Sequence, residues 1–222
     1  MADANSGSGV SIARLVLVPS LITLGVTVLR LVGELRGWAP ELFNPAPGGG
    51  GSLIGIVWLA PIFGIYFALK LLGSGNRPAS AGKAVGYAAL GLLILVSGIF
   101  LAAASQFRSP GKLVASLVLF AVAAATPFLT WPALTKALLA YGYAARLPVV
   151  VVMFFAMRGS WGTHYDAPPP DFPAMAFWPK FFMLGILPQL IFWVAFTVIA
   201  GSLFGSVTAA IVRHYKAEAP AA

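Results

Sequence analysis

The stretch PALTKALLAYGYAARLPVVVVMFFAMRG, from Pro132 to Gly159, decides how many times this chain crosses a membrane. It is apolar except near its ends and at one arginine in its middle, Arg146. Lys136 and Arg158 bracket it with a spacing of 22 residues, which a helix covers in about 33 Å, close to the thickness of a bilayer core. We therefore predict a membrane span with Arg146 halfway along it.

A rival topology for the same stretch treats its two halves separately. Leu134 to Ala145 would form an interfacial helix, and Pro148 to Met157 would form a re-entrant segment too short to cross. Arg146 would then be an anchor whose guanidinium reaches the lipid headgroups. The rival is distinct because it places the C-terminus on the other side of the membrane.

The composition of the whole chain indicates an integral membrane protein whose first partner is the lipid bilayer. Of 222 residues, 59% are hydrophobic and 9% charged, which leaves too few polar side chains to cover a soluble globule. The net charge of +8 comes from basic residues at the ends of apolar runs, a pattern typical of contact with lipid phosphates and not of nucleic-acid binding. The absence of cysteine excludes disulfides, thiolate metal sites and cysteine nucleophiles.

Five other segments are apolar and long enough to cross a bilayer, so the expected total is six spans. They are Ser11 to Val32, Ser52 to Leu72, Lys83 to Ser105, Lys112 to Thr130 and Phe181 to Val212. We predict an all-α, polytopic transmembrane helix bundle in which residues 1–222 form a single membrane domain, with polar tails at 1–10 and 213–222 and longer loops at 33–51 and 159–180. The first span is expected to be retained, because no small-residue cleavage signature follows it. Helix kinks are expected at the prolines in or near five of the six spans, Pro19, Pro61, Pro127, Pro148 and Pro188.

Six spans place both termini on one side of the membrane, and the distribution of basic residues predicts which side that is. Seven Lys or Arg residues lie on the side of the termini and six on the side of the two long loops, which favours cytoplasmic termini. The heavy use of Ala, Gly, Leu and Val is typical of a bacterial cytoplasmic membrane protein. The two long loops then face outward together and form the expected functional face.

Small residues spaced four apart indicate close helix contacts within the chain. Such pairs let helix backbones approach where lipid provides no hydrophobic driving force. The pairs are Gly51 and Gly55, Gly82 and Gly86, Gly201 and Gly205, and Ala60 and Gly64.

The glycine run PAPGGGGSLIG, from Pro45 to Gly55, resembles a phosphate-binding turn only in composition. It lacks the Lys-Ser or Lys-Thr of a P-loop, and the dinucleotide pattern breaks at Leu53 or Ile54. We interpret it as a flexible entry into the second span with Ser52 as the N-cap.

Arg146 needs a partner if it lies in the middle of a span. A charged side chain near mid-bilayer costs a few kcal/mol and normally faces a cavity, a partner or free backbone carbonyls. No carboxylate lies within the proposed spans, so an ion pair would require Glu34 to fold inward. The open alternatives are backbone carbonyls near Pro148, a bound anion or lipid headgroup, and a partner subunit.

The loop RGSWGTHYDAPPPDF, from Arg158 to Phe172, combines polar, aromatic and proline residues. His164, Asp166 and Asp171 are the residue types of an open metal site or a proton acceptor, but H-Y-D followed by A-P-P-P lacks the fixed spacing of either. We predict no metal and no cofactor, and interpret the loop as a rigid cap stiffened by its prolines. The residues expected to contact a ligand or partner are Arg146, Trp161, His164, Tyr165, Asp166 and Asp171.

Three functional hypotheses follow, and neither the glycine run nor WGTHYD matches a family signature. The first is a non-catalytic subunit or scaffold of a larger membrane assembly, with protein partners or self-association in the membrane. The second is a small transporter or channel for an anionic or neutral solute, which Arg146 and the proline-interrupted helices favour. The third is an enzyme at the membrane face that uses His164 and Asp166 of the 161–171 loop.

Overall fold

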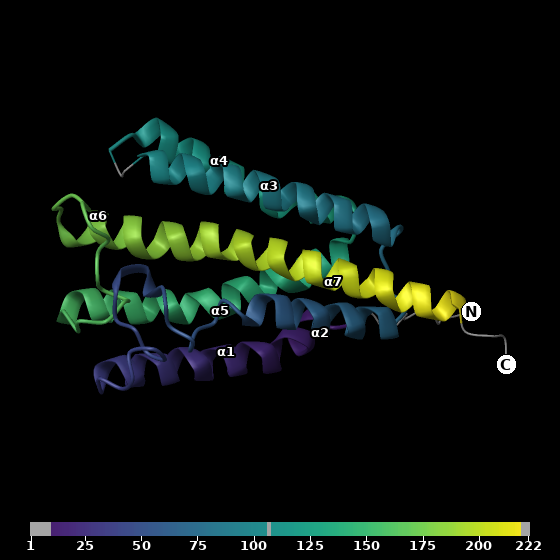
Figure 1. Cartoon of the computed structure of the whole chain (residues 1–222), viewed down its shortest axis with the longest axis horizontal. Coiled ribbons are helices and arrows are strands. Elements are labelled where there is room, and N and C mark those ends of the chain that lie inside the picture. Colours follow the sequence, from purple (N-terminus) through teal and green to yellow (C-terminus); the bar gives the residue numbers. More distant parts are fainter. Residues whose placement is uncertain (1–9, 106–107, 219–222) are drawn as a thin grey trace, which may run out of the picture.

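The computed structural model describes residues 10–105 and 108–218, and this part of the chain folds into helices and loops without a strand. α7 lies in the middle of the bundle, with the α3 and α4 pair on one side and α1, α2 and α5 on the other (Figure 1). The helices are α1 (Ile12–Leu35), α2 (Leu59–Gly73), α3 (Ala81–Ser105), α4 (Pro110–Ala125), α5 (Pro132–Gly159), α6 (Phe177–Phe181) and α7 (Trp193–Glu218), with short 3-10 turns at Pro47–Gly49 and Thr126–Leu129.

Among the described residues, five helical segments are long and apolar enough to cross a membrane. They are Ile12–Leu35, Ala81–Ser105, Pro110–Leu129, Pro132–Gly159 and Phe177–His214. Large apolar side chains cover their outward faces, as contact with lipid requires, and small or polar side chains fill much of the interior. The prediction of an all-α membrane bundle is confirmed.

α5 is one continuous helix of 28 residues, so the rival interfacial and re-entrant topology is wrong. Pro148 stays inside the helix. The helix holds together because buried residues recur every three or four positions along one side and pack against α1 and α7. Leu134, Leu138, Tyr141, Ala145, Val149 and Met153 form this buried stripe.

The second expected span is shorter than predicted, and Ser52 does not cap it. Residues 53 and 54 donate their backbone N–H groups to the carbonyls of Glu41 and Leu42, at 3.1 and 3.2 Å, instead of starting a helix. The Ser52 hydroxyl also donates to the carbonyl of Leu42. α2 therefore begins at Leu59, and its 15 residues cover only about 22 Å, less than a bilayer core of about 30 Å.

A close backbone contact joins α2 to α7. A Cβ atom added to Gly64 would lie 2.4 Å from the carbonyl oxygen of Gly201, and one added to Gly205 would lie 2.9 Å from the oxygen of Gly64. Packing within the chain is thus confirmed for Gly64 and for the pair Gly201 and Gly205. It is wrong for Gly82 and Gly86, which have open space around them.

The last span contains two π-helical turns between α6 and α7. They cover Phe182–Ile186 and Pro188–Phe192, so the helix is irregular for two turns near the loop end of the bundle. Pro188 contributes to this irregularity because it lacks the N–H that a regular helix would use. π-turns of this kind occur frequently at functional sites.

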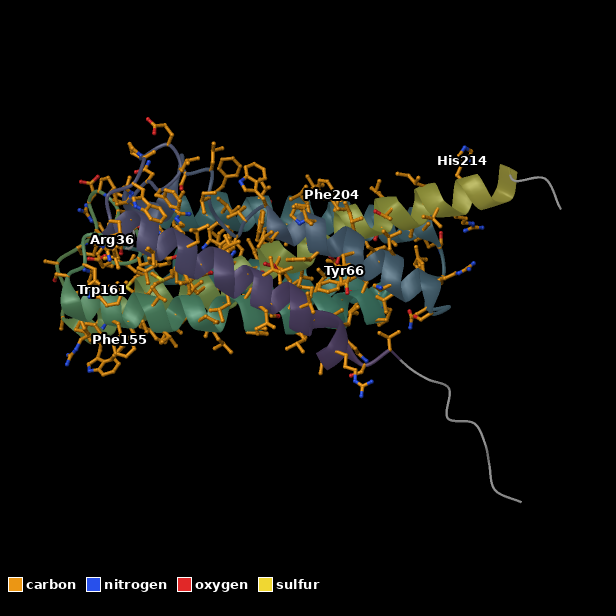
Figure 2. All side chains as sticks on the ribbon, turned by 90° about the horizontal axis from the view of Figure 1, so that it is seen from below. Arg36, Tyr66, Phe155, Trp161, Phe204 and His214 are labelled. Carbon is orange, nitrogen blue, oxygen red and sulfur yellow. The ribbon has the colours of Figure 1, made fainter. Side chains whose placement is uncertain are left out.

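Counting the short α2, the described chain makes six helical passes, and this even number brings the start of α1 and the end of α7 toward the same end of the bundle (Figure 1). The loops 36–58 and 160–176 lie together at the opposite end. Figure 2 shows the separation, with Arg36 and Trp161 at the loop end and His214 at the other.

Candidate ligand-binding cavity

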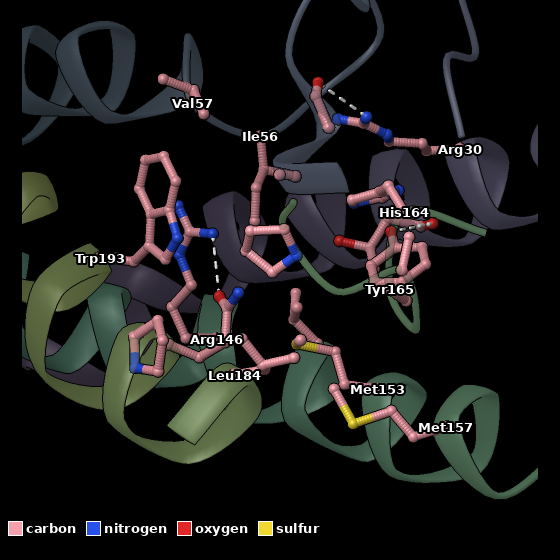
Figure 3. A pocket seen from close by; sticks show the side chains of 18 of the residues that line it. Arg30, Ile56, Val57, Arg146, Met153, Met157, His164, Tyr165, Leu184 and Trp193 are labelled. Atoms are coloured by element: carbon pink, nitrogen blue, oxygen red, sulfur yellow. Dashed lines mark hydrogen bonds between the residues drawn. The ribbon is translucent and has the colours of Figure 1, made fainter. Parts of the chain in front are cut away.

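A cavity of about 300 Å³ extends from the two long loops into the bundle (Figure 3). Its walls come from α1, the loop before α2, α5, the loop after α5, and the π-helical turns before α7. The inner part is lined by Arg146, Gln189 and Trp193, and the outer part by Arg30, Gly49 and His164. Much of the remaining lining is apolar and includes Val149, Met153, Met157, Met183 and Leu184.

Arg146 is buried at the inner end of the cavity, with 5% of its surface exposed. Its Nη1 donates to the side-chain oxygen of Gln189 at 3.2 Å, and the guanidinium stands 4.6 Å from the centre of the Trp193 ring. Its Nε has no hydrogen-bond acceptor among the described residues. The guanidinium is therefore held in place by an amide and an aromatic face while part of its donor capacity stays unused.

Arg146 lies 14 residues from the start of α5 and 13 from its end, so about 20 Å of helix separates it from either end. At this depth a charge costs a few kcal/mol, and burying an unsatisfied donor adds about 1–3 kcal/mol. Neither the neutral Gln189 amide nor the Trp193 ring neutralises the charge. A negatively charged ligand beside Arg146 would lower the free energy of burying this uncompensated charge.

A buried ion pair lies at the outer end of the cavity. The Glu34 carboxylate, whose side chain is fully buried, accepts from Arg30 Nε at 2.8 Å and is 2.5 Å from His164 Nδ1. It also accepts the backbone N–H of His164 at 2.9 Å. Arg30 continues the network by donating to the carbonyl of Gly49 at 3.0 Å.

This network fastens the two long loops to α1. His164 belongs to the loop after α5, and Gly49 to the loop before α2, so both loops are held by residues in the last two turns of α1. Gly49 has a φ of 65°, and a Cβ atom there would meet Arg30 Nη2 at 2.6 Å and the His164 ring at 2.8 Å. Only glycine fits this position without strain.

Burial shifts the pKa of both titratable cavity residues in the loop after α5, His164 and Tyr165. Burial lowers the pKa of the His164 imidazole, and the hydrogen bond to Glu34 only partly offsets this. Burial also raises the pKa of Tyr165, whose hydroxyl donates to the carbonyl of Thr27 at 3.4 Å. His164 is therefore neutral near pH 7, with Nδ1–H donating to Glu34.

The cavity brings together three of the six residues expected to contact a ligand or partner. Arg146, His164 and Tyr165 line it. Trp161 is 39% exposed and lies against Gly159, outside the cavity.

Both aspartates of the loop lie outside the cavity lining. Asp166 closes the loop turn by accepting from the backbone of Gly162 at 3.0 Å and from the backbone and hydroxyl of Thr163 at 2.8 and 2.7 Å. Asp171 is exposed at a positive φ of 62°. Within the described residues, no group of three His, Cys, Asp or Glu side chains is placed to hold a metal ion.

Four cavity or network residues were missed by the sequence reasoning. Gln189 carried a usable signal, since it is the only amide side chain in the apolar helices. Arg30 and Glu34 carried another, because their spacing of four places them on one helix face. Trp193 carried none, because an aromatic residue in an apolar span is ordinary.

The fold and the cavity together define a class, a polytopic helical membrane protein with a partly polar cavity inside its bundle. Comparison of the chain with protein-family models, with curated proteins and with solved structures gives no match.

Proposed function

We propose that this protein is a membrane transporter for small anions that carry one charged group on a short apolar body. The observation that supports this most is Arg146, a buried guanidinium halfway along α5 that lines the cavity and has an amide partner and an aromatic neighbour but no anionic one. The planar guanidinium suits a carboxylate, sulfonate or phosphate group, which can accept two parallel hydrogen bonds from it.

The shape and lining of the cavity define the rest of the ligand. A volume of about 300 Å³ is at the lower end of the range for small-molecule sites, which favours a compact solute. The side chains of Met153, Met157 and Leu184 provide an apolar wall beside the charged group. Methionine adapts to different apolar shapes, so several related anions would fit.

Transport, as distinct from binding alone, is favoured by the irregular backbone around the cavity. Non-helical backbone within a membrane is tolerated where it lines a cavity, and transporters commonly build their sites from interrupted helices near mid-bilayer. Here α2 is shortened and two π-turns precede α7, and the lining includes Ile56 and Val57 from the segment before α2 and Pro188 and Gln189 from the second π-turn. We place both termini in the cytoplasm of a bacterial cell, so that the cavity and long loops face outward.

The test is binding and efflux of short alkylsulfonates and carboxylates by the purified chain. Isothermal titration in lipid nanodiscs should show binding by the parent protein, and reconstituted vesicles should release a trapped radiolabelled sulfonate. Arg146→Gln should lose at least tenfold in affinity, because it removes the charge, and Arg146→Lys should restore part of it. Absence of binding across the series would refute the proposal.

Arg158→Gln is the matched control. Arg158 lies in the last turn of the same helix, stands 5.1 Å from the Phe177 ring and is outside the cavity lining. Its substitution should leave binding unchanged. A lipid headgroup is the alternative source of the same chemistry, and native mass spectrometry would reveal it as a copurifying anionic lipid that is lost in Arg146→Gln.

The hypothesis of a non-catalytic subunit or scaffold stays a prediction, and the same mass spectra would reveal stable partner chains. The hypothesis of an enzyme in the 161–171 loop gains no support, because Asp166 closes a turn and Asp171 lies outside the cavity lining.

A further inference from the structure

A second feature of the cavity is the histidine at its outer end. His164 lines the cavity, and its Nδ1 is held 2.5 Å from the carboxylate of Glu34. Glu34 accepts from Arg30 as well, so these two opposite charges already balance each other. Because Nδ1–H is engaged with Glu34, Nε2 is the nitrogen left to take up a proton.

Charges of both signs act on His164, so a new charge in the cavity can change its protonation. Glu34 and Asp166 favour the imidazolium, while Arg30 and burial oppose it. Arg146 is the other charged side chain that lines the cavity, and its charge acts on Tyr165, the neighbour of His164. With the cavity empty, burial keeps the ring neutral near pH 7.

An anion in the cavity would tip this balance toward the imidazolium. A sphere with the cavity's volume of about 300 Å³ is about 8 Å wide. For an anion about 8 Å from the imidazole, at an effective dielectric constant of about 20, the negative charge favours the protonated ring by about thirtyfold. The proton comes from water at the loop end and forms the Nε2–H bond, while Nδ1–H keeps its bond to Glu34. When the anion leaves, the proton returns to water.

We propose that His164 is a proton-binding site coupled to the cavity, so that an anion and a proton bind together. This inference rests on the proposed transport function. It explains why a histidine is fastened at the mouth of a cavity whose inner end holds a buried arginine. The site then carries the same charge when empty and when filled, which lowers the cost of holding an anion within a membrane.

Binding of butane-1-sulfonate at different pH values tests the coupling. This probe stays ionised at every pH used, so any proton taken up belongs to the protein. Titrations between about pH 6 and pH 8 should show affinity rising as the pH falls, by up to about thirtyfold, and uptake of protons should appear as a dependence on the ionisation enthalpy of Tris or triethanolamine buffer. His164→Gln, which keeps a donor for Glu34, should remove both effects. His214→Gln, which changes the only other histidine, should behave like the parent.

A second measurement covers the case in which His164→Gln does not fold. In the His214→Gln protein, His164 is the single histidine, and its NMR titration should move to higher pH when butane-1-sulfonate is added. Binding with the same affinity at every pH and an unmoved titration would overturn the proton site and leave the anion site standing. Absence of binding at every pH would overturn both.

Discussion

Substituting Gly64 by alanine tests the backbone contact that positions α7, and with it Gln189 and Trp193. The added Cβ atom would lie 2.4 Å from the carbonyl oxygen of Gly201 and 2.5 Å from its Cα. Both atoms belong to a helix backbone and cannot rotate away. α2 and α7 must therefore separate by about 1 Å to restore an ordinary contact distance of about 3.5 Å.

The size of the effect follows from two opposing contributions. Overpacking of this kind costs about 1–3 kcal/mol, and the backbone clash places Gly64→Ala toward the upper value. Alanine recovers about 0.5–1 kcal/mol through its better helix propensity. The net loss of about 1–2 kcal/mol corresponds to a decrease in Tm of about 2–8 °C for a chain of this length.

The assay is thermal unfolding in detergent, followed by tryptophan fluorescence, with Gly86→Ala as the control. Gly86 is exposed within α3 and has no atom within 4 Å of an added Cβ, so its substitution should preserve or raise the Tm. Gly64→Ala should also weaken sulfonate binding, because the displaced α7 carries part of the cavity. Equal Tm values for the two variants would refute the proposed α2 and α7 contact.

Two further predictions concern the loop after α5. Burial lowers the pKa of His164 below its ordinary value of about 6.5. The stability that the neutral His164 side chain contributes is therefore complete above about pH 6.5 and is lost as the pH falls through the lowered pKa. Tm measured against pH should show this loss in the parent and not in His164→Gln. Asp166→Ala should lower the free energy of unfolding by about 1–3 kcal/mol, because the backbone N–H groups of Gly162 and Thr163 lose their acceptor. Asp171→Asn is the control and should have no measurable effect on Tm, since asparagine tolerates a positive φ.

Composition and apolar run length were sufficient to predict the membrane bundle. A segment such as Lys83 to Ser105 has one stable state in a bilayer, because only a helix satisfies every backbone hydrogen bond within the segment itself. The same constraint predicts Pro132 to Gly159 as a span despite Arg146. The expected helix does not form over Ser52 to Val57, because backbone groups there find partners at Glu41 and Leu42, which are distant in sequence from the helix they would otherwise start.

The sequence by itself determined that Arg146 needs a partner and that the long loops carry the polar side chains. Only the tertiary structure decided what those side chains meet. Gln189 is 43 residues from Arg146, and Glu34 is 130 from His164, so no local spacing predicts either pair. Helix packing sets these contacts, because the packing of α5 against α1 and against the π-turns before α7 determines which side chains reach one cavity.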